Sequence, residues 1–144
     1  MPGDRLLHPV ALAAVALMAF NDHWMKVYQP GVLSGKLSDV AGLPVLALTL
    51  FALAEVASRR LLGRRALLAC MAVAAVGYTL VEVWAPAELA WCWTWGALQW
   101  PVRAAFAASR GDGMPTVAPV RAWSDWTDLL VLPAVGGAWL ARRR

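Results

Sequence analysis

The residues with the clearest chemical potential in this chain are four aspartates and a histidine near the ends of long apolar runs. They are Asp22, His23, Asp39, Asp125 and Asp128. Aspartate oxygens are typical ligands of hard divalent cations such as Mg²⁺, Mn²⁺ and Ca²⁺. Histidine is the side chain most often used as a general base near neutral pH. These residue types therefore predict one acidic, histidine-containing site, and a divalent cation is the cofactor that would suit it.

Each of these residues has a role in an enzymatic interpretation. The catalytic groups are His23, Asp22, Asp39 and Asp128, and the metal ligands are Asp22, Asp39, Asp125 and Asp128. The basic side chains of Lys36, Arg103 and Arg121 would bind the phosphate of a lipid headgroup. The sequence contains no Ser-His-Asp arrangement and no Gly-rich phosphate loop with its lysine. It therefore identifies neither the substrate nor the reaction.

Apolar runs in the rest of the chain predict the helices that position these residues. Of 144 residues, 60% are hydrophobic and only 15% are charged, which is typical of a membrane protein. A helix of about 20 residues crosses the hydrocarbon layer, and four segments approach that length. They are about 6–25, 40–57, 66–84 and 123–141. We therefore expect an all-α integral membrane protein, a four-helix transmembrane bundle in which residues 1–144 form a single domain.

The first apolar run and the segment that follows it allow more than one interpretation. The first apolar run also fits a cleaved signal peptide, whose apolar centre of about 7–15 residues matches 10–20. No persuasive cleavage site follows it, which favours a retained span. The Pro30-Gly31 pair predicts a turn after this span, and Ser38 or Asp39 is predicted to cap the start of the second.

A tryptophan-rich helix is predicted at about 87–108. Its polar or small side chains recur every three or four residues and share one face: Glu88, Cys92, Gly96, Gln99 and Arg103. Tryptophan prefers the headgroup level of a membrane, so we expect an interfacial or partly inserted helix whose polar face meets the bundle or water. A fifth full span is the alternative.

Arginine clusters predict the orientation of the spans. With four spans and both termini in the cytoplasm, eight Lys and Arg residues lie inside and five lie outside, which agrees with the positive-inside rule. The clusters at 59–65 and 142–144 adjoin apolar runs and act as topology signals, so the net charge of +4 does not indicate nucleic-acid binding. The lipid bilayer, and a lipid headgroup at its outer face, are the expected partners. The oligomeric state is not predicted.

Three stretches resemble the marks of a group of small, uncharacterised bacterial multi-pass membrane proteins. They are Asn-Asp-His-Trp-x-Lys at 21–26, Gly-Lys-Leu-Ser-Asp-x-Ala-Gly-Leu at 35–43 and Asp-x-Thr-Asp-Leu-Leu at 125–130. Trp126 stands where proline would be expected. The resemblance implies a bacterial inner-membrane location and a shared polar site, but no activity comes with it.

A non-catalytic interpretation competes with the enzyme. Asp22 and Lys26 are spaced as a helical ion pair, as are Glu55 and Arg59, and Asp39 could simply cap its helix. In this alternative the chain is a membrane scaffold or accessory subunit whose polar helix ends interlock structurally. Carboxylates that each find a donor or a cation favour the scaffold, and carboxylates that converge without partners favour the enzyme.

Overall fold

The regular structure of this protein is helical throughout the described residues, 1–121 and 124–142 of a computed structural model. The chain forms two compact units. Unit 1 comprises Met1–Tyr78 and Thr127–Arg144, and unit 2 comprises Thr79–Trp126. The all-α prediction is confirmed for the described residues.

Unit 1 begins with a short 3₁₀ turn, η1 (Asp4–Leu7), and a long helical stretch. This stretch consists of α1 (Pro9–Phe20), a π-helical turn η2 (Asn21–Met25) and α2 (Lys26–Tyr28), which follow one another without a break. The first helix was predicted at 6–25, but it starts later because proline at its first position fixes φ for a helix start. The His8 ring accepts a hydrogen bond from the Val10 N–H at 3.3 Å and caps this start.

The second long helix, α3 (Val32–Ser58), begins eight residues before the predicted start at 40. The Ser34 hydroxyl accepts from the Gly31 N–H at 3.1 Å and donates to the Gly31 carbonyl at 2.9 Å, which fixes the first turn. The predicted cap at Ser38 or Asp39 is therefore wrong, because both residues lie inside the helix.

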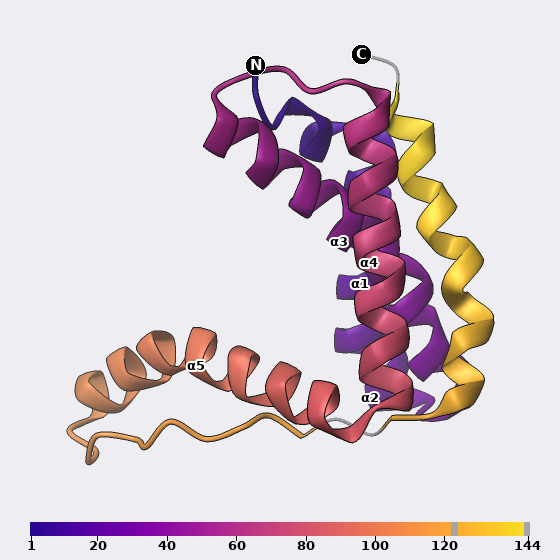
Figure 1. The fold of residues 1–144 in the computed structure, drawn as a ribbon. Coiled ribbons are helices and arrows are strands. Elements are labelled where there is room, and N and C mark those ends of the chain that lie inside the picture. The colour runs from indigo at the N-terminus through magenta and orange to yellow at the C-terminus, as the bar shows by residue number, and fades with distance from the viewer. Residues whose placement is uncertain (122–123, 143–144) are drawn as a thin grey trace. The chain divides into compact units, whose positions relative to one another are not determined.

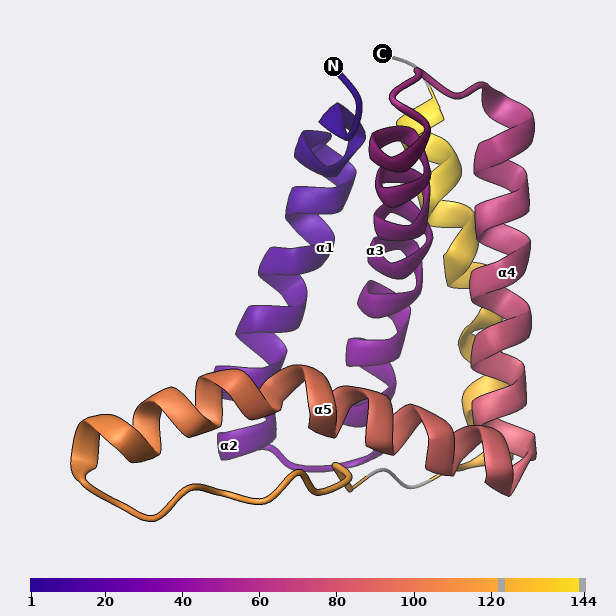
Figure 2. The same cartoon turned by 60° about the vertical axis from the view of Figure 1, so that its left-hand side comes forward.

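Unit 1 is completed by most of α4 (Arg64–Val83) and by the C-terminal helix η3 (Trp126–Arg142), which is wound as a 3₁₀ helix. Four helices contribute to one core, and Figure 2 shows them running next to one another. The core residues are mostly small or aliphatic: Ala11, Ala47, Leu48, Phe51, Leu67, Ala74, Ala138 and Ala141. Alanine at the contacts lets neighbouring helix backbones approach closely, as is common where helices pack in membranes.

The outer surface of this bundle remains apolar. Large hydrophobic side chains stay exposed on each long helix, for example Val15 of α1, Leu53 of α3 and Val73 of α4. Among the described residues, α3 and α4 are the helices both long enough and apolar enough to cross a membrane. The predicted span at 40–57 falls within α3, and the predicted span at 66–84 matches α4 except for its last residue.

The two ends of unit 1 differ in composition. At the arginine end, the N-terminal turn and the end of η3 lie beside the connection of residues 59–63 between α3 and α4 (Figure 1). The opposite end, here called the polar end, carries η2, α2 and the start of α3 (Figure 2). Most of the predicted site residues of unit 1 belong to the polar end.

Unit 2 is a helix covered on one side by an extended segment. The helix α5 (Ala85–Arg110) includes the predicted stretch 87–108 and ends at Gly111, whose φ of 73° lies in the left-handed region that glycine readily adopts. The strap, residues 112–121, then returns along the helix (Figure 2). The Val120 N–H donates to the Cys92 carbonyl at 3.0 Å, and the Trp100 indole donates to the Pro115 carbonyl at 2.7 Å.

The strap buries part of the polar face of α5. Cys92 and Gly96 were expected to meet the bundle or water, but both are buried within unit 2. A Cβ atom at Gly96 would lie 2.0 Å from the Ala118 carbonyl oxygen, so only glycine allows this close approach. The prediction was wrong for these two residues because a distant segment of the same unit covers them.

Candidate functional site

The polar end of unit 1 brings together residues from the first helical stretch and from α3. The Asn21 amide nitrogen donates to the Ser34 carbonyl at 2.6 Å and to the Ser38 hydroxyl at 2.7 Å. The Ser38 hydroxyl in turn donates to the Asp22 carboxylate at 3.0 Å. Asp22 also forms an ion pair with Lys26 at 2.7 Å. A continuous hydrogen-bond chain therefore connects a fully buried amide to an exposed ion pair.

The π-helical turn explains why neighbouring residues point in different directions here. In η2 the Lys26 N–H bonds to the Asn21 carbonyl, five residues back rather than four. This wider winding inserts an extra residue and changes the register of the side chains that follow. Asn21 is completely buried against α3, whereas Asp22 and His23 are exposed.

A second group at the polar end joins α3, α4 and η3. The Lys36 ammonium lies 2.5 Å from an Asp128 carboxylate oxygen and 2.9 Å from the Thr127 hydroxyl. Both charged side chains of this pair are largely shielded, with 24% of Lys36 and 18% of Asp128 exposed. The Tyr78 hydroxyl donates to the half-buried Asp39 carboxylate and lies 3.5 Å from the Asp128 backbone oxygen. These contacts link three helices through polar side chains.

Electrostatic interactions extend across the polar end. The Asp39 carboxylate is repelled by Asp128 and attracted by Lys26 and Lys36. Asp22 is attracted by Lys26 and by His23. Three carboxylates thus share two ammonium groups, and each carboxylate has at least one hydrogen-bond or ion-pair partner. Asp22, His23, Asp39 and Asp128 all belong to the polar end of unit 1, and their role as one site stays a prediction.

The remaining predicted site residues belong to unit 2. The Asp125 backbone N–H donates a hydrogen bond to the Glu82 carboxylate at 2.9 Å. This contact involves the side chain of Glu82 and the backbone, not the carboxylate, of Asp125. Arg103 and Arg121 are both exposed, and Arg103 borders a shallow hollow near the end of α5. Lys36, the third residue expected to bind phosphate, is engaged by Asp128 in unit 1.

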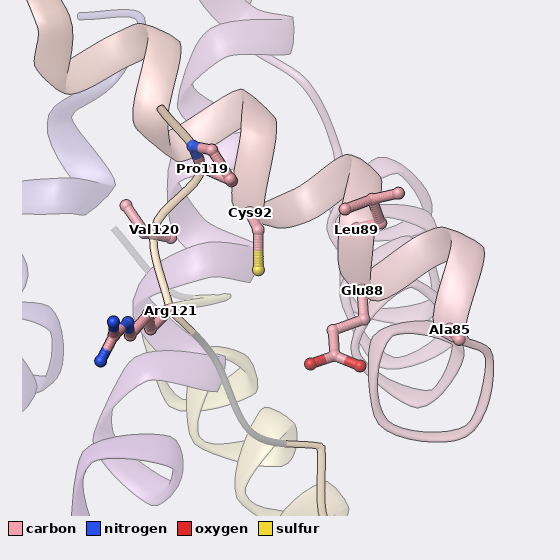
Figure 3. A pocket seen from close by; sticks show the side chains of 7 residues that line it. All are labelled: Ala85, Glu88, Leu89, Cys92, Pro119, Val120 and Arg121. Carbon is pink, nitrogen blue, oxygen red and sulfur yellow. The ribbon is translucent and has the colours of Figure 1, made fainter. Parts of the chain in front are cut away.

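A larger pocket, of about 590 Å³, opens between the first turns of α5 and the end of the strap (Figure 3). Its lining combines apolar side chains with one carboxylate, one thiol and one guanidinium: Ala85, Glu88, Leu89, Cys92, Pro119, Val120 and Arg121. The Ser124 hydroxyl donates to the Glu88 carboxylate at 3.1 Å. In Figure 3 the Arg121 guanidinium points away from the Glu88 carboxylate, so the two charges do not form a pair across the pocket.

The capacity to hold a metal ion is limited by the arrangement of ligands. In 1–121 and 124–142, no three His, Cys, Asp or Glu side chains are grouped so that they could hold a metal ion. This includes the predicted ligands Asp22, Asp39, Asp125 and Asp128. The cysteines are also separate, because Cys70 lies in α4 and Cys92 is buried under the strap.

Comparisons with known proteins give no family to this chain. No protein-family model, no curated protein and no solved structure matches it. The resemblance based on the three motifs therefore stays a prediction.

A polar cluster at the arginine end was not predicted from the sequence. The Glu55 side chain is completely buried, and its carboxylate accepts from the Gly3 N–H and the Leu62 N–H, both at 2.9 Å. Buried Arg5 stacks its guanidinium 4.3 Å from the centre of the Phe51 ring. The expected helical pair of Glu55 with Arg59 is replaced by backbone donors. A lone glutamate in an apolar run was the available signal, because such a residue needs partners.

Proposed function

We propose that this chain is a multi-pass membrane protein that acts as a non-catalytic scaffold or accessory subunit, with polar helix ends that interlock at one end of a four-helix bundle. In this proposal the first helical stretch, α3, α4 and η3 cross the inner membrane of a bacterium. Both termini lie in the cytoplasm with the arginine end, and the polar end faces outward. The helix α5 lies at the outer interface.

The exposed surface of the long helices supports the membrane part of the proposal. Only 11% of the apolar window of α4 is buried inside the protein, whereas the core helix of a soluble bundle would be mostly buried. Side chains such as Val73 and Val76 remain about 60% exposed, at 61% and 58% respectively. Apolar surface of this extent requires an apolar environment, and lipid tails provide it.

The observation that carries the scaffold proposal is the pairing of carboxylates at the polar end. Asp22 is paired with Lys26, Asp128 with Lys36, and Asp39 with the Tyr78 hydroxyl. Such pairing neutralises carboxylates at a membrane edge without a cofactor. It also ties η3 to α3, two helices that are far apart in the sequence.

Measurement of thermal stability in detergent with divalent cations tests this proposal. A scaffold should unfold at the same temperature in Mg²⁺, Mn²⁺ or Ca²⁺ as in NaCl of equal ionic strength. The Asp128→Asn variant should unfold at a lower temperature in every salt, because Lys36 loses its counter-ion. A stabilisation specific to one divalent cation, lost in Asp39→Asn and kept in the surface control Asp112→Asn, would contradict the scaffold.

That contradictory result would favour the second candidate, a divalent-cation-dependent enzyme acting on a phosphate-bearing lipid headgroup. The specific observation in its favour is that Asp22, Asp39 and Asp128 gather at one end of unit 1, beside an exposed His23. A hard cation would relieve the repulsion between Asp39 and Asp128. The cation experiment separates the two candidates because only the enzyme gains stability from the metal.

A further inference from the structure

Four arginines occupy the short connection between α3 and α4. Arg59 and Arg60 follow the end of α3, and Arg64 and Arg65 open α4. All four side chains are exposed. In the part of the chain that the structure describes, no carboxylate forms an ion pair with any of them. The connection is therefore a patch of concentrated positive charge with no counter-ion among residues 1–121 and 124–142.

Hydrogen bonds to Glu55, near the end of α3, fix the backbone that carries these arginines. The Leu62 N–H donates to the buried Glu55 carboxylate at 2.9 Å, and the Arg60 N–H donates to the Glu55 carbonyl at 3.2 Å. The other carboxylate oxygen of Glu55 accepts from Gly3, which joins the N-terminal turn to the same anchor. An ordered connection loses less conformational entropy on binding than a flexible one.

Arg59 occupies a backbone position that normally favours glycine. It ends α3 with a φ of 52° and a ψ of 32°, in the left-handed region. Side chains other than glycine are strained there, and strain of this kind is often found at functional positions. An arginine at this position adds a charge to the patch at the expense of backbone strain.

We propose that the α3–α4 connection is a binding surface for the phosphate groups of anionic phospholipids. This inference rests on the proposed membrane function: when α3 and α4 both cross the bilayer, residues 59–63 lie at the level of the headgroups. Guanidinium groups bind phosphate through two parallel hydrogen bonds. The first turn of α4 adds backbone N–H groups that also favour an anion. Arg59 and Arg60 from one helix end and Arg64 and Arg65 from the next then surround the same headgroup layer.

The Glu55 carboxylate anchors the backbone that carries the patch, whereas the lysines of the polar end are themselves held in ion pairs. At the polar end each lysine is neutralised within the protein. At the arginine connection the positive charges remain available to a partner. Juxtamembrane clusters of four to eight basic residues are typical of proteins that bind anionic lipids.

The experiment uses the full-length protein in mixed micelles and counts bound lipid by native mass spectrometry. Phosphatidylglycerol should bind in preference to phosphatidylcholine. Each arginine near the surface contributes about fivefold to this affinity, so Arg59→Gln with Arg60→Gln should weaken phosphatidylglycerol binding by about 25-fold. The control, Arg110→Gln on an exposed arginine of unit 2, should leave it unchanged. Equal loss in the control and in the double variant, or no loss in the double variant, overturns the proposal.

Two further variants keep the test independent of folding and insertion. Arg59→Gly removes one guanidinium, so it should weaken phosphatidylglycerol binding. It also relieves the strain of the left-handed backbone, so it should not lower thermal stability. Replacement of all four arginines by lysine preserves the charge and should keep the preference for anionic lipid while lowering affinity, because bidentate contacts are lost. A parallel loss of stability and binding in Arg59→Gly would overturn the proposal, since a structural defect would then explain both.

Other anions are distinguished in the same assay. Inorganic phosphate at millimolar concentration should not displace phosphatidylglycerol. If phosphate does displace the lipid, the surface is a site for free phosphate instead, and the proposal is overturned. A short duplex DNA that binds more tightly than the lipid and loses affinity in the same variants would also overturn the proposal. A protein that stays monodisperse without detergent would refute the membrane function itself, and this outcome is separate from any change in lipid preference.

Discussion

The ion pair between Lys36 and Asp128 should contribute more to stability than the ion pair between Asp22 and Lys26. The first pair joins α3 to η3 and is mostly shielded, with 24% and 18% of its side chains exposed. The second joins residues one helical turn apart and is 44% and 45% exposed. The two pairs lie at the same end of unit 1, so they form a matched comparison within one protein.

The expected magnitudes follow from shielding and geometry. A hydrogen bond to a charged group contributes roughly 1.5–3 kcal/mol when it is protected from water, which suits the 2.5 Å contact of Lys36 with Asp128. An exposed pair spaced four residues apart on a helix contributes about 0.3–0.5 kcal/mol. Removal of one partner of the shielded pair should cost about 2–3 kcal/mol, below the range for fully buried pairs because some exposure remains.

Double-mutant cycles measure this difference directly. The first cycle uses Lys36→Met and Asp128→Asn, and the control cycle uses Lys26→Met and Asp22→Asn, with the free energy of unfolding determined by denaturant titration in detergent. The non-additive part of each cycle is the coupling energy of the pair. The reasoning is refuted if the coupling between Lys36 and Asp128 is no larger than the coupling in the control cycle.

Two further expectations follow from the packing, and a third follows from the distribution of the arginines. Gly96→Ala should speed thiol modification of Cys92 by about tenfold or more, with Cys70 as the internal reference, because overpacking against Ala118 costs roughly 1–3 kcal/mol and displaces the strap; an unchanged rate would show that the strap does not cover this thiol in solution. Glu55→Gln should lower the free energy of unfolding by roughly 1–3 kcal/mol, since two backbone N–H groups lose a charged acceptor, and an unaltered denaturation midpoint would argue against the anchor. Reporter domains fused after the C-terminus and inserted in the strap should report opposite sides of the membrane, and a C-terminal fusion on the outer side would contradict the topology.

Helix positions were largely predictable because their signals are local. The span predicted at 66–84 corresponds to α4 at Arg64–Val83, and the helix predicted at 87–108 corresponds to α5 at Ala85–Arg110. Gly63 and Arg64 mark the start of α4, and Arg110 and Gly111 mark the end of α5, in the sequence itself. Apolar length and boundary residues depend on neighbours in the chain, so no knowledge of tertiary contacts was needed.

The start of α3 was not predictable in the same way. Ser34, Ser38 and Asp39 are all residue types that favour helix starts. The structure uses Ser34 for this purpose, whereas the Ser38 hydroxyl is occupied by Asn21 from another helix. The choice among equivalent capping residues was decided by a tertiary contact, which spacing along one helix does not reveal.

The candidate site shows the same division between local and distant information. The pair of Asp22 with Lys26 follows from a spacing of four residues, and the structure confirms it. The partner of Asp128 is Lys36, which is 92 residues away. Topology predicted that the carboxylates gather at one end, but it did not predict which cation each would meet. Glu55 illustrates the same limit, because its donors come from Gly3 and Leu62 and not from the next turn.

The 3₁₀ winding of η3 gives this helix a greater length per residue, which bears on the membrane arrangement proposed above. A 3₁₀ helix rises about 2.0 Å per residue, so the 17 residues of η3 extend about 34 Å. An α-helix of the same 17 residues would extend only about 26 Å, which is shorter than a hydrocarbon layer of about 30 Å. In the proposed membrane arrangement, the tighter winding would let this short, proline-containing segment match the hydrocarbon layer without tilt or local thinning of the lipid. Deletion of one residue would shorten η3 by about a third more than the same deletion would shorten α4. In the proposed arrangement, the mismatch between helix length and bilayer thickness should therefore be most sensitive to changes in η3.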